Sequence, residues 1–165
     1  MIYVSRLFSQ ISTRLEGDST LMALLPAGAT ITNDIGLDNP RLPLITFNMV
    51  SDTPSDAFRL MASEVAFDLH VWAERLPSAV PSVSGQTDGM VHACTIVERV
   101  IGDWASQTWA TGPTFGLDRW KPDMSTSGYA CSMLRRASLR TEHEDETLHF
   151  IIEFRATMSR TTVQG

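Results

Sequence analysis

The sequence predicts an α+β fold in which an antiparallel sheet of about four to five strands is covered on one face by helices. Residues 65–72 and 147–156 alternate apolar and polar side chains with a period of two, which is typical of strands with one buried face. Strands buried on both faces of parallel sheets read as continuous apolar runs, so the alternation favours an antiparallel sheet. Residues 2–15 and 89–101 carry apolar side chains at helical spacing and provide the cover.

Local signals place the remaining elements. Gly17 stops the first helix, Asp18 or Ser19 caps a second, and the segment around Pro54 is too long for a two-residue turn. The expected elements, in chain order, are helices over 2–15 and 19–25, strands over 29–33 and 44–50, a hairpin loop over 52–62, a strand over 63–72, a helix over 89–101, and strands over 132–142 and 147–156 joined by a charged tip.

The 165 residues are expected to form a single domain over residues 1–165, because this length suits one core. Residues 104–128 are rich in Trp, Pro and Gly and have no sustained period, so a long loop segment is expected there. Residues 159–165 are expected to form a polar tail.

The net charge of the chain limits the classes of molecule that it is expected to bind. Thirteen basic and nineteen acidic side chains give a net charge of −6, which disfavours broad attraction to nucleic acid phosphates and predicts no sequence-specific nucleic acid binding. No apolar run approaches the roughly 20 residues that span a bilayer, so no membrane partner is expected. A negatively charged chain of this kind is expected to bind other proteins.

No segment carries a recognisable reaction centre. Ser84 and Ser127 lie beside glycines but complete no nucleophile motif, and the chain has neither GxxxxGK[ST] nor GxGxxG. The run from His143 to Glu146 is typical of a solvated hairpin tip, because consecutive side chains point in different directions. His70 and His149 could meet on neighbouring strands, but zinc usually needs three or four ligands. We therefore expect no enzyme, no catalytic residue, no metal site and no cofactor.

The polar faces of the two alternating strands are the most distinctive surface. Trp72 stands on the polar face of its strand, where it either forms part of an interface or lies under the Trp-rich segment of the same chain. Arginines in the closing hairpin either pair with Glu142 and Glu153 or meet an acidic surface on a partner or another copy. These arginines are Arg135, Arg136, Arg140, Arg155 and Arg160.

The order of elements resembles that of the tail terminator (tail completion) proteins of long-tailed bacteriophages. The likeness covers most of residues 1–158, and its most telling parts are the strand opened by Pro43-Leu44-Ile45-Thr46-Phe47 and the strand Phe67-Asp68-Leu69-His70-Val71-Trp72-Ala73 before a helix. The resemblance implies a small structural virion protein of the tail or neck, assembled in the host cytoplasm. It also implies a six-fold ring that caps the tail tube, stops its polymerisation and meets head-completion (neck) proteins, with DNA passing through the lumen.

Two groups of residues are candidates for contacts in such an assembly. A ring needs edges that close head to tail, which a charged open sheet face provides. The candidate subunit-contact residues are Asp68, His70, Trp72, His149, Glu153 and Arg155. The candidate tail-tube contacts, in the loop over 52–62, are Asp52, Pro54, Asp56, Phe58 and Arg59.

Other classes of protein remain open at this point. The chain could be a different neck or head-tail adaptor, a small hydrolase or metal-dependent enzyme, or a ligand-binding domain. A ligand-binding domain is expected to remain monomeric, whereas in an enzyme replacement of His70, His143 or His149 should change metal content or turnover.

Overall fold

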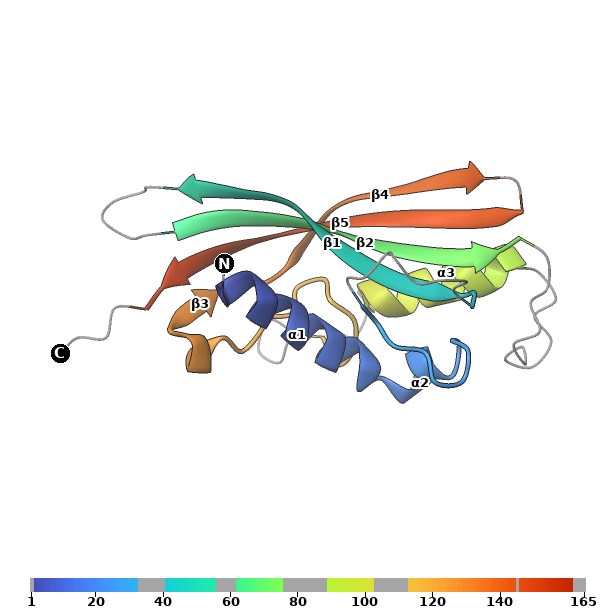
Figure 1. Cartoon of the computed structure of the whole chain (residues 1–165), viewed down its shortest axis with the longest axis horizontal. Helices are drawn as coiled ribbons and strands as arrows, with labels where there is room; N and C mark the ends of the chain where they lie inside the picture. Colours follow the sequence, from blue (N-terminus) through green and yellow to red (C-terminus); the bar gives the residue numbers. More distant parts are fainter. Residues whose placement is uncertain are drawn as a thin grey trace.

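The computed structural model describes residues 2–32, 41–55, 62–75, 89–102, 113–144 and 146–161 (Figure 1). Its helices are α1 (Ile2–Glu16), α2 (Ser19–Met22), α3 (Gly89–Ile101) and the short 3-10 helix η1 (Ser125–Ser127). Its strands are β1 (Leu44–Ser55), β2 (Ala62–Glu74), β3 (Tyr129–Cys131), β4 (Arg135–Glu144) and β5 (Thr147–Arg160). No helix in these ranges is long and apolar enough to cross a membrane.

The five strands form one antiparallel sheet, so the predicted α+β class with an antiparallel sheet is confirmed. The strand order is β1-β2-β5-β3, and β4 pairs with β5 as well. Because β5 has 14 residues, one edge of it accommodates β4 along most of its length and β3 at its end. The long strands β2 and β5 therefore form the centre of the sheet.

One face of the sheet contains the apolar core. Phe67 pairs with Phe154 and their rings stack with centroids 5.6 Å apart. In the same register Leu69 pairs with Ile152, both fully buried, as the alternation predicts.

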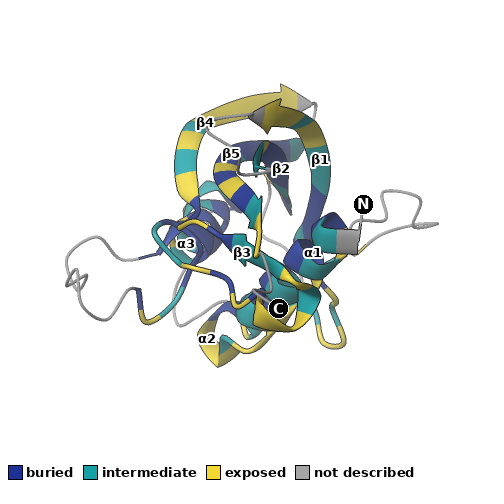
Figure 2. Ribbon diagram, turned by 90° about the vertical axis from the view of Figure 1, so that its left-hand side faces the viewer, coloured by how far each residue is buried: buried dark blue, intermediate teal, exposed yellow. Residues whose placement is uncertain are grey.

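Helices pack on this apolar side. Phe8 of α1 lies against Phe47 of β1 and Phe67 of β2, with ring centroids 4.7 and 5.9 Å apart. Ile96 and Val100 of α3 are fully buried, and α3 contacts β2 and β5. Figure 2 shows α1, α2 and α3 on the same side of a strongly curved sheet.

Two glycines join α3 to the segment that leads to β4. Gly102 and Gly116 both have positive φ, and a Cβ on Gly116 would lie 2.4 Å from the Gly102 Cα. This close approach lets the backbone N–H groups of Leu117 and Asp118 donate to the carbonyls of Val100 and Ile101, each at 2.9 Å. The end of the helix is thereby tied to the segment that precedes η1 and β3.

Three boundary predictions are wrong. Within 29–33, the described residues 29–32 form only an isolated parallel bridge, from Thr32 to Thr46, instead of a strand. The loop expected from Asp52 begins later, because a register shift between Met49 and Ser51 lets β1 continue to Ser55. Pro54 is tolerated there because β1 is an edge strand.

The third boundary error concerns the tail expected over 159–165. Ser159 and Arg160 belong to β5 because β3, which was not predicted, pairs with them. The remaining described residues of the Trp-rich segment, 113–128, are irregular except for η1, and residues 103–112 lie outside the described ranges.

Candidate functional site

The face of the sheet opposite the core is the candidate site, and we call it the open face. It carries all six predicted subunit-contact residues: Asp68, His70 and Trp72 on β2, and His149, Glu153 and Arg155 on β5. In Figure 2, β1 and β4 rise on either side of β2 and β5, so this face is the inside of the curve. Curvature explains why Asp68 and His149 are only 9% and 5% exposed although no described helix lies over them.

A line of polar side chains crosses four strands of the open face, with hydrogen bonds across β1, β2 and β5 and a contact of 3.6 Å to β4. Nε2 of His70 lies 2.8 Å from Oδ1 of Asn48 on β1, and its Nδ1 lies 2.8 Å from Nε2 of His149 on β5. Nδ1 of His149 is 3.6 Å from a carboxylate oxygen of Glu142 on β4. We call these four residues, Asn48, His70, His149 and Glu142, the cross-strand line.

The geometry of the line limits its protonation. A hydrogen bond between two ring nitrogens needs one donor and one acceptor, so His70 and His149 cannot both be fully protonated while it persists. Burial is the main cause that lowers the pKa of both imidazoles, and His70 lowers that of His149 further. A first proton on His149 would point Nδ1–H at Glu142, which makes Glu142 the natural counter-ion.

Trp72 packs on the cross-strand line. Its ring stacks on His149, the residue opposite it in the β2–β5 register, with centroids 3.4 Å apart and planes 10° from parallel. The indole therefore covers one side of the buried imidazole, and Trp72 itself stays half-buried. Cross-strand aromatic pairs of this kind stabilise sheets.

Charged side chains also lie on the open face. Nη2 of Arg140 is 3.5 Å from Asp68, and Nε of the same residue is 3.9 Å from Glu142. Arg155 lies 2.8 Å from Glu153 and 3.6 Å from Glu64. Intrachain pairing of the arginines, one of the two alternatives from the sequence, is therefore present at Arg140 and Arg155.

The predicted tail-tube residues lie at one end of the β1–β2 hairpin. Asp52 and Pro54 belong to β1, and Asp56, Phe58 and Arg59 lie outside the described ranges. The hydroxyl of Tyr3 in α1 donates a hydrogen bond to the Asp52 carboxylate, and this hydrogen bond is the main cause that raises the pKa of Tyr3. Asp52 is therefore bound to α1, whereas Pro54 is exposed.

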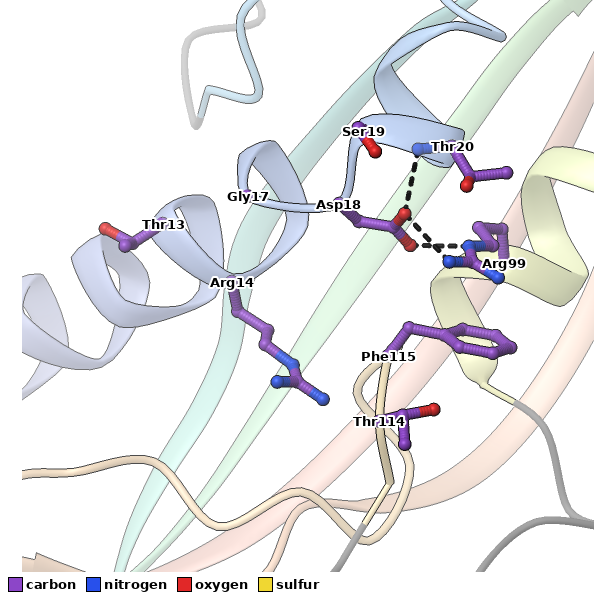
Figure 3. A pocket seen from close by; sticks show the side chains of 9 residues that line it. All are labelled: Thr13, Arg14, Gly17, Asp18, Ser19, Thr20, Arg99, Thr114 and Phe115. Atoms are coloured by element: carbon purple, nitrogen blue, oxygen red, sulfur yellow. Dashed lines mark hydrogen bonds and ion pairs between the residues drawn. The ribbon is translucent and has the colours of Figure 1, made fainter.

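A pocket of about 400 Å³ on the helical side holds the strongest ion pair (Figure 3). Asp18 caps α2 and receives two hydrogen bonds from Arg99 of α3, at 2.5 and 2.9 Å. Burial acts to raise the pKa of Asp18, but hydrogen bonds from Arg99 and the Leu21 N–H lower it below its usual value. Arg99 also lies over the Phe115 ring, 3.5 Å from its centroid. These contacts join three elements and give the pocket a structural role.

The sequence predicted which residues share the open face, but it did not predict all four members of the cross-strand line. Asn48 and Glu142 were missed as members, although Asn48 alternates with the core-facing positions of β1, a signal that places it on the open face. Thr46 has the same placement, and its buried hydroxyl has no hydrogen-bond partner within the described part of the chain. Among the residues that the structure describes, no three His, Cys, Asp or Glu side chains gather as metal ligands would.

Comparisons with known proteins identify a family and a shared fold. Residues 9–96 match the family model described as "Tail completion protein gp17". The fold is similar to a chain in a structure titled "Virion of native gene transfer agent (GTA) particle", with a TM-score of 0.54 and 10% identity over 90% of this chain and 91% of that one. At that identity the likeness establishes a shared fold. No curated protein matches the chain.

Proposed function

We propose that this chain is a tail terminator. It belongs to the tail completion protein gp17 family. It is therefore a structural protein of a phage virion tail and not an enzyme. In this proposal copies of the chain close into a ring, with six subunits as the expected number. The ring caps the finished tail tube, stops its polymerisation and receives the head-completion (neck) proteins. DNA passes through its lumen.

The open face is the feature of the structure that supports a ring most directly. Its polar side chains are organised across four strands, and none of the described helices covers them. Two buried polar atoms of this face, Oγ1 of Thr46 and Nδ1 of His149, have no hydrogen-bond partner among the described residues. A face of this kind suits contact with a neighbouring subunit, which Asp68, His70, Trp72, His149, Glu153 and Arg155 would provide.

The oligomeric mass of the purified full chain tests the ring. Six copies of 18.2 kDa give about 109 kDa, and light scattering at tens of micromolar together with electron microscopy should show a closed ring. A chain that stays monomeric at high concentration would contradict the proposal. Labelling the protein in intact virions distinguishes the tube end from a different junction of the neck, where another adaptor would lie.

The end of the β1–β2 hairpin is the proposed contact with the tail tube protein. Near its turn the hairpin is held by the hydrogen bond from Tyr3 to Asp52, while Val50, Thr53 and Pro54 nearby are exposed. Pro54 and residues 56–61, which include Asp56, Phe58 and Arg59, would supply the contact. Asp52 would hold the hairpin in position.

A shortened hairpin tests this contact without disturbing the sheet. Ser55 pairs with Ala62, so an Asn-Gly turn in place of residues 56–61 should close the hairpin in register. The variant should fold and form rings but fail to cap, so phage assembled with it should have over-long tails. A full-length chain with Val50→Ala, at a 55% exposed position of β1 outside the proposed contact, serves as the matched control for local stability. Tails of normal length with the shortened hairpin would refute the contact.

A further inference from the structure

A pocket lined by two arginines lies on the open face where β4 begins. Arg135 of β4 and Arg155 of β5 are directly opposite each other in the sheet register. They line a pocket of about 360 Å³, together with Glu64, Ser132, Met133 and Thr157. Like charges directly opposite each other are unfavourable in a sheet, so each arginine gains from an acidic partner.

The chain neutralises this pocket only in part. Arg155 has Glu153 and Glu64 as partners at 2.8 and 3.6 Å, whereas no ion pair to Arg135 forms within the described ranges. Met133 is 41% exposed at the rim. An exposed arginine beside an exposed methionine favours a partner that brings a carboxylate and some apolar surface.

The other end of the same hairpin is acidic. Glu74, Glu142 and Glu146 are exposed where β2, β4 and β5 end together, and Glu144 and Asp145 belong to the same turn region in the sequence. Figure 1 shows this end of β4 and β5 at the far right, while β4 begins near the middle of the sheet. The hairpin therefore has a basic beginning and an acidic tip.

These two ends cannot neutralise each other within one chain. From Arg135 to Glu144 the strand covers ten residues, which corresponds to about 30 Å at roughly 3.4 Å per residue. The Debye length is about 8 Å at physiological ionic strength, so their mutual attraction is screened. Both ends remain available to other molecules.

We propose that the acidic end around Glu74 and Glu146 of one copy docks into the Arg135/Arg155 pocket of the next. This contact joins two different surfaces of the same chain, so it is head-to-tail, and repeated contacts of that type close into a ring. It rests on the proposed ring and identifies the two surfaces that form it. The charge complementarity sets the direction of assembly, and Met133 supplies apolar contact beside the ion pairs.

Charge reversal at each end tests the pairing. The basic-end variant is Arg135→Glu, and the acidic-end variant is Glu74→Lys with Glu146→Lys. All three positions are exposed, so each variant should fold normally. Either variant should associate roughly a hundredfold more weakly than the wild-type chain at 150 mM salt, because it places like charges together.

Two experiments that restore opposite charges at the contact show whether the two ends bind each other. An equimolar mixture of the variants should regain the ring, with the two kinds of subunit alternating, because each tip then meets a pocket of opposite charge. One chain carrying all three reversals should also form rings. Glu98→Lys, an exposed charge reversal on α3, is the control for charge reversal away from both ends and should leave assembly unchanged. Independently, raising the salt concentration should weaken the wild-type ring.

The outcomes separate this contact from the ring itself. If the wild-type chain forms rings and either reversal leaves them intact, the contact is wrong while the ring stands. If the variants dissociate but neither the mixture nor the triple reversal recovers rings, the two ends do not bind each other. A wild-type ring insensitive to salt also overturns the proposal. A monomeric wild-type chain overturns the ring and this contact with it.

Discussion

The two faces of the sheet bury side chains in different ways. On the helical side Phe67 is fully buried between Phe8 and Phe154, and its surroundings are apolar. On the open face His149 is 5% exposed, but its neighbours are a histidine, a tryptophan and a glutamate at an exposed edge. Burial on the first face stabilises the monomer, whereas burial on the second leaves polar groups that a neighbouring molecule could complete.

Truncation of a side chain in the apolar core should have the largest effect on the free energy of unfolding. Phe67→Ala removes a fully buried ring from between two others and should lower the free energy of unfolding by about 3–5 kcal/mol. Urea unfolding measures this change. Leu139→Ala, at a 44% exposed position on the edge strand β4, is the control and should change stability by about 0.5 kcal/mol or less. Similar losses at both positions would contradict the assignment of the core.

Loss of a polar contact on the helical side should have the second-largest effect on the free energy of unfolding. Asp18→Ala removes both the cap of α2 and the ion pair with Arg99, and should cost about 2–3 kcal/mol. Asp18→Asn keeps a capping acceptor but loses the charge, so it should cost roughly half as much. Equal losses in the two variants would mean that the cap contributes nothing beyond the ion pair.

On the open face, His149 combines stacking and hydrogen bonding, and two variants separate them. His149→Phe keeps an aromatic ring against Trp72 but removes the hydrogen bond to His70, with an expected loss of about 1 kcal/mol. His149→Ala removes both contacts and should cost about 2 kcal/mol. Urea unfolding of the monomer at pH 7.5 measures both. No loss in either variant would show that the cross-strand line contributes nothing to the monomer.

The sequence allowed the two faces to be assigned because strand side chains alternate. Residues Val65 to Trp72 and Leu148 to Arg155 separate cleanly into core and open positions, and the register confirms that separation. The meeting of His70 and His149 was anticipated only as a possibility. They are 79 positions apart in the chain, and a pairing register between distant strands has no local signature.

Other features depend on contacts that no short segment encodes. Gly102 and Gly116 touch through their backbones, but each reads in sequence as an ordinary turn glycine. The extension of β1 through Pro54 depends on a register shift and on a free edge, both properties of the assembled sheet. The pocket between Arg135 and Arg155 likewise exists only because β3 and β4 share one edge of β5.

The smallest expected effect is the pH dependence of the open face. The pKa values of His70 and His149 are lowered in the folded chain, mainly by burial, so the unfolded chain binds more protons as the pH falls below about 6.5. Stability should therefore be greatest above that pH and should decline as the pH falls from there through the lower folded-state values. Asp68, Glu142 and Arg140 face the pair and modulate the decline.

The histidine pair can be isolated from the carboxylates by a matched variant. The double substitution His70→Asn with His149→Phe removes both imidazoles and should flatten the difference in unfolding free energy between pH 7.5 and pH 5.5. Phe67→Ala, which lowers stability on the other side, should keep the full pH difference if its unfolding remains measurable. An unchanged pH difference in the double variant would show that the decline originates from groups other than the two histidines. A flattened difference would show that the open face, unlike the apolar side, makes the stability of this chain sensitive to protons.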